Sequence, residues 1–151
     1  MTHILILNGP NLNMLGRREP ELYGSQTLRD IRLLCEKAAD SLGLTIDFRQ
    51  SNHEGELVTW IQEALDRIDG IVINAAAYTH TSIAIHDALK LHDVPIVEVH
   101  LTDPKSRENF RHVSYIEKLA AAVVAGKGAA GYAEALSILS TRMKPADGKG
   151  F

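Results

Sequence analysis

The sequence predicts an α/β fold built on a five-stranded parallel sheet. Short apolar runs alternate with longer amphipathic stretches, which is the order expected when crossover helices join parallel strands. The apolar runs are nearly continuous in hydrophobicity, as strands covered by helices on both faces require. Because 151 residues is a usual size for one domain, we expect a single domain over residues 1–144.

The elements follow in order from this pattern. The expected strands are residues 4–7, 45–49, 71–73, 96–99 and 121–125. The expected helices are residues 28–42, 54–68, 82–91 and 130–143. Gly43 marks the end of the first helix, and Pro95 lies beyond the end of the third.

Two segments interrupt the alternation. Residues 8–25 are rich in Gly and Pro and predict a long loop, which at this length is typical of a lid or binding loop. Residues 102–114 follow the fourth strand and predict a second, charged loop. Residues 145–151 carry Pro145, Gly148 and Gly150, so we expect a disordered tail.

Composition excludes several classes of protein. Hydrophobic residues make up 45% and charged residues 23%, which is typical of a globular domain rather than a disordered one. The net charge of −3 provides no basic field, so nucleic acid is not an expected partner. Cys35 is the only cysteine, which excludes an internal disulfide and fits a reducing cytoplasm. The first apolar run is too short for a signal peptide or a membrane span, so we expect a soluble, cytoplasmic protein.

The fourth strand ends in a carboxylate and an imidazole. Ligands of doubly wound sheets bind beyond the carboxyl ends of the strands, and this is where Glu98 and His100 lie. Side chains two residues apart on a strand point to the same face. A carboxylate beside an imidazole fixes its tautomer and stabilises the protonated ring, as a general acid requires. A partly exposed strand end is the structural alternative.

Polar residues also follow the third strand. Asn74 and His80 precede a helix for which Thr81 or Ser82 is the expected N-cap. A cap explains one hydroxyl but neither the amide nor the imidazole. We therefore expect this segment to recognise a polar ligand.

Two further motifs have a structural explanation. Ser51 and Glu54 have the spacing of a capping box, which we expect to begin the second helix. The run Gly126-Lys127-Gly128-Ala129-Ala130-Gly131 spells the dinucleotide pattern G-x-G-x-x-G, but no further strand follows to complete that unit. We expect these glycines to permit tight turns and close packing of the last helix.

The two loops carry cations and a phenol. Arg17 and Arg18 precede Tyr23 in the first loop, and Arg107 and Arg111 lie in the second. If the loops close together, positive charge stabilises the phenolate of Tyr23 and makes it a base. Two solvated, Arg-rich loops are the alternative interpretation.

Six motifs together resemble the type II 3-dehydroquinate dehydratases. They occur in that family's order and spacing, from the first strand to the last helix. The motifs are Asn8-Gly9-Pro10-Asn11-Leu12-Asn13, Gly16-Arg17-Arg18-Glu19-Pro20 with Tyr23-Gly24, Gln50-Ser51-Asn52-His53-Glu54-Gly55, Tyr78-Thr79-His80-Thr81-Ser82, Glu98-Val99-His100 and Arg107-Glu108-Asn109-Phe110-Arg111.

The resemblance implies a flavodoxin-like sheet and reversible elimination of water from 3-dehydroquinate, giving 3-dehydroshikimate. It implies no metal, organic cofactor or Schiff base, and a homo-oligomer in which trimers gather into a dodecamer. The reaction serves either aromatic biosynthesis or quinate breakdown.

The resemblance also assigns roles to individual residues. The implied catalytic residues are Tyr23 as base, Arg18 as the lid cation beside it, Asn11 as holder of a water at the enolate, and His100, oriented by Glu98, as the acid for the departing hydroxyl. The implied binding residues are Asn74, His80 and Arg111 for the ring hydroxyls, the backbone N–H groups of Leu101 and Thr102 for the carboxylate, and Asp87 facing a neighbouring subunit's site.

Three positions depart from the family pattern. Thr102 and Asp103 stand where Ser and Asn are usual, Ala75-Ala76 replaces a glycine-containing pair, and His86 takes a frequent Arg position. Thr102 keeps its hydroxyl and its backbone donor. Asp103 brings a carboxylate near the expected anion site, so we expect it to repel the substrate carboxylate and raise KM.

Two other functions stay open on the sequence. His80, Glu98 and His100 could form the two-His, one-carboxylate site of a metal-dependent hydrolase. A noncatalytic flavodoxin-like binding module is the second alternative.

Overall fold

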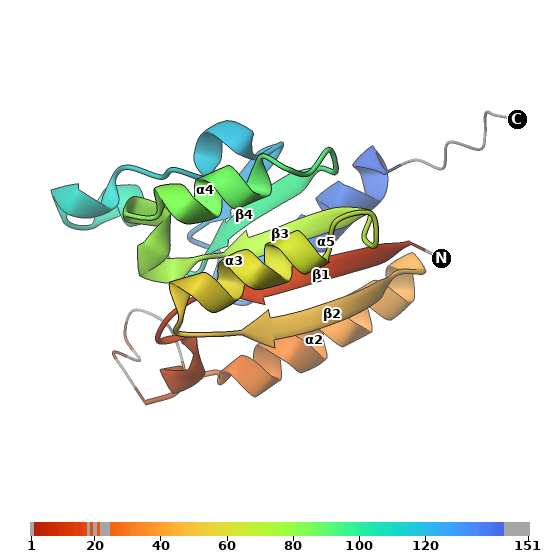
Figure 1. Cartoon of the computed structure of the whole chain (residues 1–151). Helices are drawn as coiled ribbons and strands as arrows, with labels where there is room; N and C mark the ends of the chain where they lie inside the picture. Colours follow the sequence, from red (N-terminus) through yellow and green to blue (C-terminus); the bar gives the residue numbers. More distant parts are fainter. Residues whose placement is uncertain (1, 18, 20, 22–24, 144–151) are drawn as a thin grey trace, which may run out of the picture.

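The computed structural model describes residues 2–17, 19, 21 and 25–143, and in them five parallel strands form one sheet. The strands are β1 (His3–Asn8), β2 (Thr45–Gln50), β3 (Gly70–Asn74), β4 (Ile96–His100) and β5 (Ala122–Ala125). They lie side by side in the order β2-β1-β3-β4-β5 (Figure 1). This is the flavodoxin-like doubly wound order, so the predicted fold is confirmed.

The helices cover both faces of the sheet. They are α2 (Leu28–Leu42), α3 (Glu54–Glu63), α4 (Ile83–Leu89) and α5 (Ala130–Arg142). Helices α2 and α5 pack together on one face, and α3 and α4 on the other (Figure 1). Thr27 and Asp30 form a capping box at the start of α2, and Gly43 ends it in the left-handed conformation, φ 72°. The predicted bounds of α2 are confirmed.

Helix α3 ends earlier than the sequence pattern indicates. The amphipathic pattern extends to residue 68, whereas the helix ends at Glu63 with Ala64 as its C-cap. Asp66 then adopts a φ of 64°, which no right-handed helix can contain. Local backbone conformation therefore overrides the hydrophobic pattern here.

The capping box predicted for Ser51 and Glu54 is wrong. His53 is the N-cap of α3, and no side chain caps this helix. The Ser51 hydroxyl instead donates to Glu56 Oε1 at 2.6 Å, and Glu54 accepts a hydrogen bond from the Ser82 hydroxyl. Both side chains are thus used in contacts that tie α3 to its surroundings.

The glycine-rich run before α5 has the structural role expected of it. Gly126 and Gly128 have φ values of 79° and 61°, which glycine adopts without strain. A Cβ at Gly131 would lie 3.2 Å from Val124 Cγ1 and 3.6 Å from Val99 Cγ1. The absence of a side chain at this position lets α5 pack closely on the sheet.

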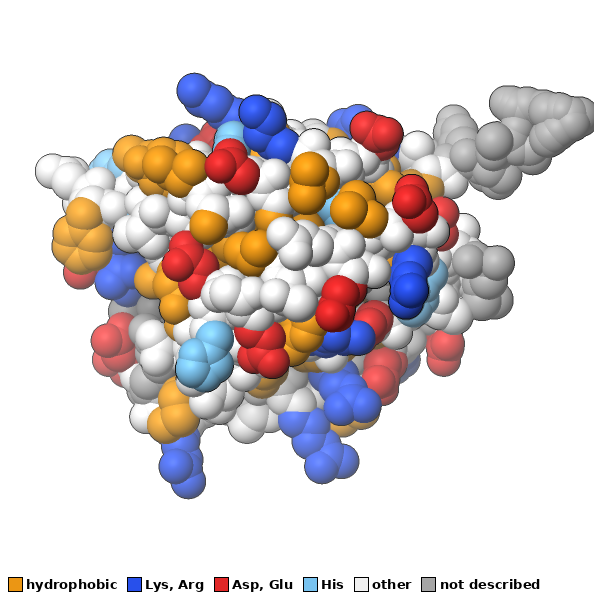
Figure 2. Space-filling model, viewed as in Figure 1, with side chains coloured by type: hydrophobic (Ala, Val, Ile, Leu, Met, Phe, Trp, Pro, Cys, Tyr) orange, Lys and Arg blue, Asp and Glu red, His pale blue; other side chains and the backbone are white. Residues whose placement is uncertain are grey.

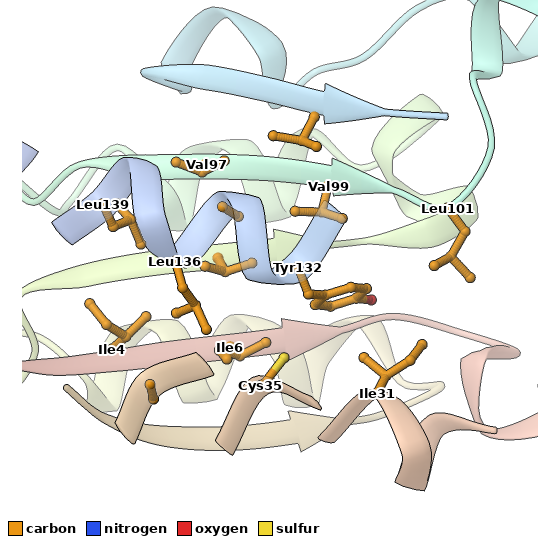
Figure 3. Close-up of a cluster of buried hydrophobic side chains, with 14 of the residues drawn as sticks. Ile4, Ile6, Ile31, Cys35, Val97, Val99, Leu101, Tyr132, Leu136 and Leu139 are labelled. Atoms are coloured by element: carbon orange, nitrogen blue, oxygen red, sulfur yellow. The ribbon is translucent and has the colours of Figure 1, made fainter. Parts of the chain in front are cut away.

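Two hydrophobic clusters fill the space between the sheet and its helices. One lies under α2 and α5 and includes Ile6, Val99 and Leu136 (Figure 3). The other lies under α3 and α4 and includes Ile73 and Ile85. Each fully buried aliphatic side chain contributes about 1.5–3 kcal/mol to stability, so both faces hold the strand ends in place.

Parts of two predicted segments lie outside the described residues. These are positions 18, 20 and 22–24 of the expected lid and the tail from residue 144 onward. In the remainder of the chain, none of the helices combines the length and the apolar character needed to cross a membrane.

Candidate active site

A pocket lies beyond the carboxyl ends of β1, β3 and β4. The residues predicted for the site that line this pocket are Asn11, Asn74, His80, His100, Leu101, Thr102 and Arg111. They come from four separate segments of the sequence. The parallel topology brings these segments together because it gathers the strand ends at one edge of the sheet.

The loop after β1 passes very close to the end of β3. The Gly9 N–H donates to the Asn74 carbonyl at 2.8 Å. A Cβ on Gly9 would lie only 2.2 Å from the Ala75 carbonyl oxygen, so no other residue fits without a backbone shift. This contact fixes the start of the first loop against the pocket.

Asn11 is held at the rim of the pocket by its backbone. Its φ is 71°, a left-handed conformation that asparagine tolerates better than most residues. Its N–H donates to Asn52 Oδ1 at 2.9 Å, and the Gln50 amide donates to the same oxygen at 3.2 Å. This backbone anchoring leaves the Asn11 side chain exposed at the pocket.

Glu98 and His100 form a buried pair at the end of β4. Glu98 is fully buried and His100 is 8% exposed, and His100 Nε2 lies 2.5 Å from Glu98 Oε2. The hydroxyls of Thr79 and Ser114 also donate to Oε2, each at 2.8 Å. Because an ionised carboxylate only accepts, Nε2 carries the ring proton in this contact.

The surroundings of Glu98 keep it ionised. Burial alone raises the pKa of Glu98, but the hydrogen bond and charge of His100 and the hydroxyls of Ser114 and Thr79 lower it further than burial raises it. The net pKa lies below the ordinary value of 4.5. A carboxylate at this position accepts from His100 Nε2 and thereby fixes the orientation of the ring at the pocket.

His80 is held as a neutral ring. Its Nδ1 lies 2.7 Å from the Val113 carbonyl, which can only accept, so Nδ1 carries the proton. Burial is the largest influence on the pKa of His80 and lowers it, and the positive charges of His100 and Arg111 act in the same direction. Its Nε2 is therefore available as a hydrogen-bond acceptor.

Asn74 is buried at the floor of the pocket. Its Oδ1 accepts from the Ala76 N–H at 3.1 Å, and its Nδ2 donates to the Tyr132 hydroxyl at 2.9 Å. Tyr132 is not among the predicted site residues, because it lies in the last helix, directly after a glycine-rich run that has a structural explanation. Only the tertiary structure brings it under the pocket.

Backbone N–H groups lie at the end of β4. No hydrogen bond from the N–H of Leu101 or Thr102 is found among the residues that the structure describes, and both residues line the pocket. Arg107 lines it too and lies 3.4 Å from the Thr102 hydroxyl. Arg111 is 24% exposed and pairs with Glu108 at 2.7 Å. This end of the pocket therefore suits an anion.

Asp103, from which a repulsion of the substrate carboxylate is expected, has a hydrogen bond to the backbone. Its carboxylate accepts from the Lys105 N–H at 3.0 Å and caps a short 3-10 helix. The side chain is exposed. Asp103 does not line the pocket at Asn74, but it lines an adjoining hollow that shares His80, His100 and Arg111 with that pocket. One carboxylate oxygen is thus engaged by the backbone beside the site.

Four of the predicted site residues are not placed in this pocket, and Glu98, buried behind His100, is one of them. Tyr23 and Arg18 lie outside the described residues. Asp87 is exposed on α4 and does not line the pocket.

The metal site considered from the sequence is not formed. Across the described ranges, no three His, Cys, Asp or Glu side chains are arranged to hold a metal ion. His80 is turned to the Val113 carbonyl and His100 to Glu98. This geometry gives no support to the hydrolase alternative.

Thr79 and Ser114 were not predicted as site residues. Thr79 belongs to the motif around His80, and Ser114 ends the second loop, but a hydroxyl in a loop carries no signal of its target. Their common partner, Glu98, becomes apparent only when the loop is folded over β4.

Comparison with known proteins identifies the family. A sequence model described as dehydroquinase class II matches residues 2–140. The chain belongs to the class II dehydroquinase family. The 3-dehydroquinate dehydratase of Streptomyces coelicolor is 62% identical over 130 residues, which is 85% of this chain and 83% of that protein. That of Mesorhizobium japonicum is 55% identical over 144 residues, 95% of this chain and all of that protein.

Solved structures of class II dehydroquinases share the fold. The type II dehydroquinase from Propionibacterium acnes superposes with a TM-score of 0.89 at 43% identity, covering 93% of this chain and 97% of that one. The enzyme from Butyrivibrio crossotus gives a TM-score of 0.88 at 41% identity, covering 91% and 97%. The resemblance recognised in the sequence motifs is therefore confirmed.

Proposed function

We propose that this chain is a type II 3-dehydroquinate dehydratase, a hydro-lyase that reversibly eliminates water from 3-dehydroquinate. The observation that carries the proposal is the buried Glu98–His100 pair beside a pocket suited to a carboxylate and several hydroxyls. Membership of the class II dehydroquinase family supports the same reaction. Elimination beside a ketone needs a base, an enolate stabiliser and an acid for the leaving hydroxyl, and each has a candidate here.

The first step is removal of the proton beside the ketone. Tyr23, as a phenolate stabilised by the Arg18 cation, takes this proton and leaves an enolate. Asn11, whose side chain is exposed at the pocket rim, holds a water that donates to the enolate oxygen. Stabilising the enolate lowers the barrier to breaking the C–H bond.

The second step is departure of the hydroxyl. The enolate electrons reform the ketone and the conjugated double bond, the C–O bond breaks, and protonated His100 donates its proton to the leaving oxygen. The ionised carboxylate of Glu98 accepts from His100 Nε2 and holds the ring in place for this step. The proton gained by Tyr23 returns to His100 through solvent, which restores the enzyme without a cofactor.

The substrate is held by the remaining pocket residues. Its carboxylate binds the N–H groups of Leu101 and Thr102, which have no acceptor within the described residues. Its hydroxyls bind Asn74, His80 and Arg111, and His80 Nε2 supplies an acceptor.

The experiment that tests this function is incubation with 3-dehydroquinate while the ultraviolet absorbance of the conjugated enone is followed. We expect absorbance to rise with the wild-type chain and to rise about 10² to 10⁴ times more slowly with Tyr23→Phe, the usual contribution of a general base. Product formed by wild type without any loss in Tyr23→Phe would contradict the mechanism but not the reaction. No absorbance change with wild type would contradict both.

We also propose a homo-oligomer, with trimers gathered into a dodecamer and Asp87 facing a neighbouring subunit's site. Asp87 is exposed on α4, where Ile83 is 57% exposed, and Val113 in the adjacent loop is 55% exposed. Figure 2 shows hydrophobic side chains gathered over α4 and the neighbouring loop. Light scattering should give twelve times the mass of the 16.6 kDa chain, and a monomer mass would exclude the assembly.

We also propose a cytoplasmic location, because the one cysteine of the chain forms no disulfide and so fits a reducing compartment.

A further inference from the structure

Tyr132 lies directly beneath the pocket without lining it. It is fully buried in the first turn of α5, where Gly131 allows the helix to approach the sheet closely. In Figure 3 its hydroxyl points along the strands toward Leu101, which is the end of the sheet that carries the pocket. A buried phenol needs a hydrogen-bond partner, and this one has two.

The hydrogen bonds of Tyr132 have only one possible direction. Asn8 donates through Nδ2 to the Arg49 carbonyl at 3.0 Å, so the oxygen of the Asn8 amide faces the phenol. The Tyr132 hydroxyl donates to that oxygen at 2.7 Å. Because the phenol proton is used in that bond, the Tyr132 oxygen can only accept in its second hydrogen bond, which Asn74 Nδ2 donates at 2.9 Å.

This direction and the Ala76 N–H together determine how Asn74 faces the pocket. The Asn74 nitrogen must point to the phenol, and its oxygen accepts from the Ala76 N–H at 3.1 Å. With both contacts made, the amide has one N–H and one lone pair left, at defined positions. A ring hydroxyl of the substrate can both donate and accept, and so matches these two groups.

We propose that Tyr132 is a positioning residue for substrate binding, whose hydroxyl, together with the Ala76 N–H, holds the Asn74 amide in the orientation that receives a substrate hydroxyl. This inference rests on the proposed function, because it takes Asn74 as a ligand of 3-dehydroquinate. It assigns a role to a residue of the last helix, 58 positions away from Asn74 in the sequence.

A purely structural role would need the ring and not the hydroxyl. Phenylalanine fills nearly the same volume and would preserve the packing against α2 and β4. Burial raises the pKa of Tyr132 above its ordinary value, so the phenol keeps its proton and the direction of its hydrogen bonds does not change near neutral pH. The phenol oxygen therefore remains a hydrogen-bond acceptor for the Asn74 amide.

The kinetic test compares Tyr132→Phe with Leu139→Ala. Leu139 is fully buried in the same helix and the same hydrophobic cluster, but at the far end from the pocket (Figure 3). We expect Tyr132→Phe to raise KM about tenfold and to leave kcat within about twofold, because Asn74 binds ground state and transition state alike. Leu139→Ala should lower the melting temperature and leave KM unchanged. An equal KM in wild type and Tyr132→Phe, or an equal rise in both variants, would overturn the proposal.

The dependence on Asn74 is tested by a double-mutant cycle. In an Asn74→Ala background, Tyr132→Phe should change KM no further, since the group that it positions is gone. If the fold-changes in KM of the two substitutions multiply in the double variant, Tyr132 acts independently of Asn74, which would contradict the proposal. Should Tyr132→Phe fail to fold, Asn8→Ala offers a second test, because it frees the phenol proton to turn toward Asn74.

A crystal structure of Tyr132→Phe gives a readout that does not depend on turnover. We expect the Asn74 amide to move from its wild-type position, because the Ala76 N–H is then the one hydrogen bond still holding it among those described. An unmoved amide would overturn the positioning role even if 3-dehydroquinate is a substrate. A wild-type chain without dehydratase activity would contradict the proposed function. A displaced Asn74 amide in the variant would still show that the Tyr132 hydroxyl positions Asn74.

Discussion

At the scale of single residues, the arrangement around Glu98 separates two tasks that both fall on His100. Its Nε2 is bound to Glu98 Oε2 at 2.5 Å, so that nitrogen orients the ring. The proton for the leaving hydroxyl must therefore come from the second ring nitrogen, Nδ1. Thr79 and Ser114 hold the carboxylate in place, because both donate to the same oxygen.

His100→Ala should impair loss of water more than removal of the proton. The imidazole acts on the leaving oxygen and not on the carbon acid, so Tyr23 can still form the enolate. We expect exchange of the substrate's α-proton with deuterated solvent, followed by mass spectrometry, to persist while product formation falls by about 10² or more. Equal loss of both rates would indicate that His100 is only structural.

Asp103→Asn should have little effect on substrate binding. The carboxylate accepts from the Lys105 N–H, and asparagine can accept in the same way. We expect KM to stay within about twofold at low and at high salt, since the exposed carboxylate is engaged by the Lys105 N–H and screened by solvent. Glu108→Gln is the matched control, because Glu108 pairs with Arg111 at the pocket and its loss should change KM. If KM for Asp103→Asn drops several-fold at low salt and the drop vanishes at high salt, Asp103 does repel the substrate carboxylate.

The sequence motifs identify the residues that touch the pocket, but not those that hold them. Asn74, Glu98 and His100 lie at or near strand ends, and topology alone predicts that such positions converge. His80 lies in the segment that follows β3. Tyr132 acts on Asn74 through a contact that depends on how α5 packs, which no local pattern contains.

At the scale of elements, hydrophobic periodicity places the five strands and four α-helices of the described residues, but neither every end nor the short 3-10 helices. Strands buried on both faces are continuous apolar runs, and α2 shows both its cap and its terminal glycine. The end of α3 was missed because Asp66 adopts a left-handed conformation that the amphipathic pattern does not reveal.

Two glycine substitutions should have opposite effects. Gly9→Ala puts a Cβ 2.2 Å from the Ala75 carbonyl oxygen, so the first loop must move away from β3. We expect a loss of about 1–3 kcal/mol in the free energy of unfolding and a rise in KM. Gly55 lies in α3 with nothing within 4 Å of its Cβ position, so Gly55→Ala should add about 0.5–1 kcal/mol without changing KM. Urea unfolding and steady-state kinetics measure both, and equal stabilities would contradict the steric argument.

At the scale of the whole molecule, the order of the strands is where the sequence is least informative. The alternation of runs and helices predicts a parallel sheet, but several strand orders satisfy it. The family resemblance selects the flavodoxin-like order, and the sheet order β2-β1-β3-β4-β5 confirms it. That order places β1 and β3 side by side, which is what brings Asn8 and Asn74 within reach of one phenol.

Burial of Cys35 between α2 and the sheet couples the stability of the whole fold to alkaline pH (Figure 3). Burial, and to a lesser extent the charge of Glu36, raises the pKa of Cys35 from 9.0 to about 12. Between these values the unfolded chain releases the thiol proton and the folded chain keeps it, so stability falls as pH rises, by up to about 1.4 kcal/mol per pH unit. Cys35→Ala loses some packing, so at pH 8 it should be less stable than wild type. Because it has no thiol to ionise, it should lose less stability than wild type between pH 9 and 10.5. Urea unfolding at fixed protein concentration measures both slopes, and parallel slopes for the two proteins would show that the thiol ionises equally well in the folded state.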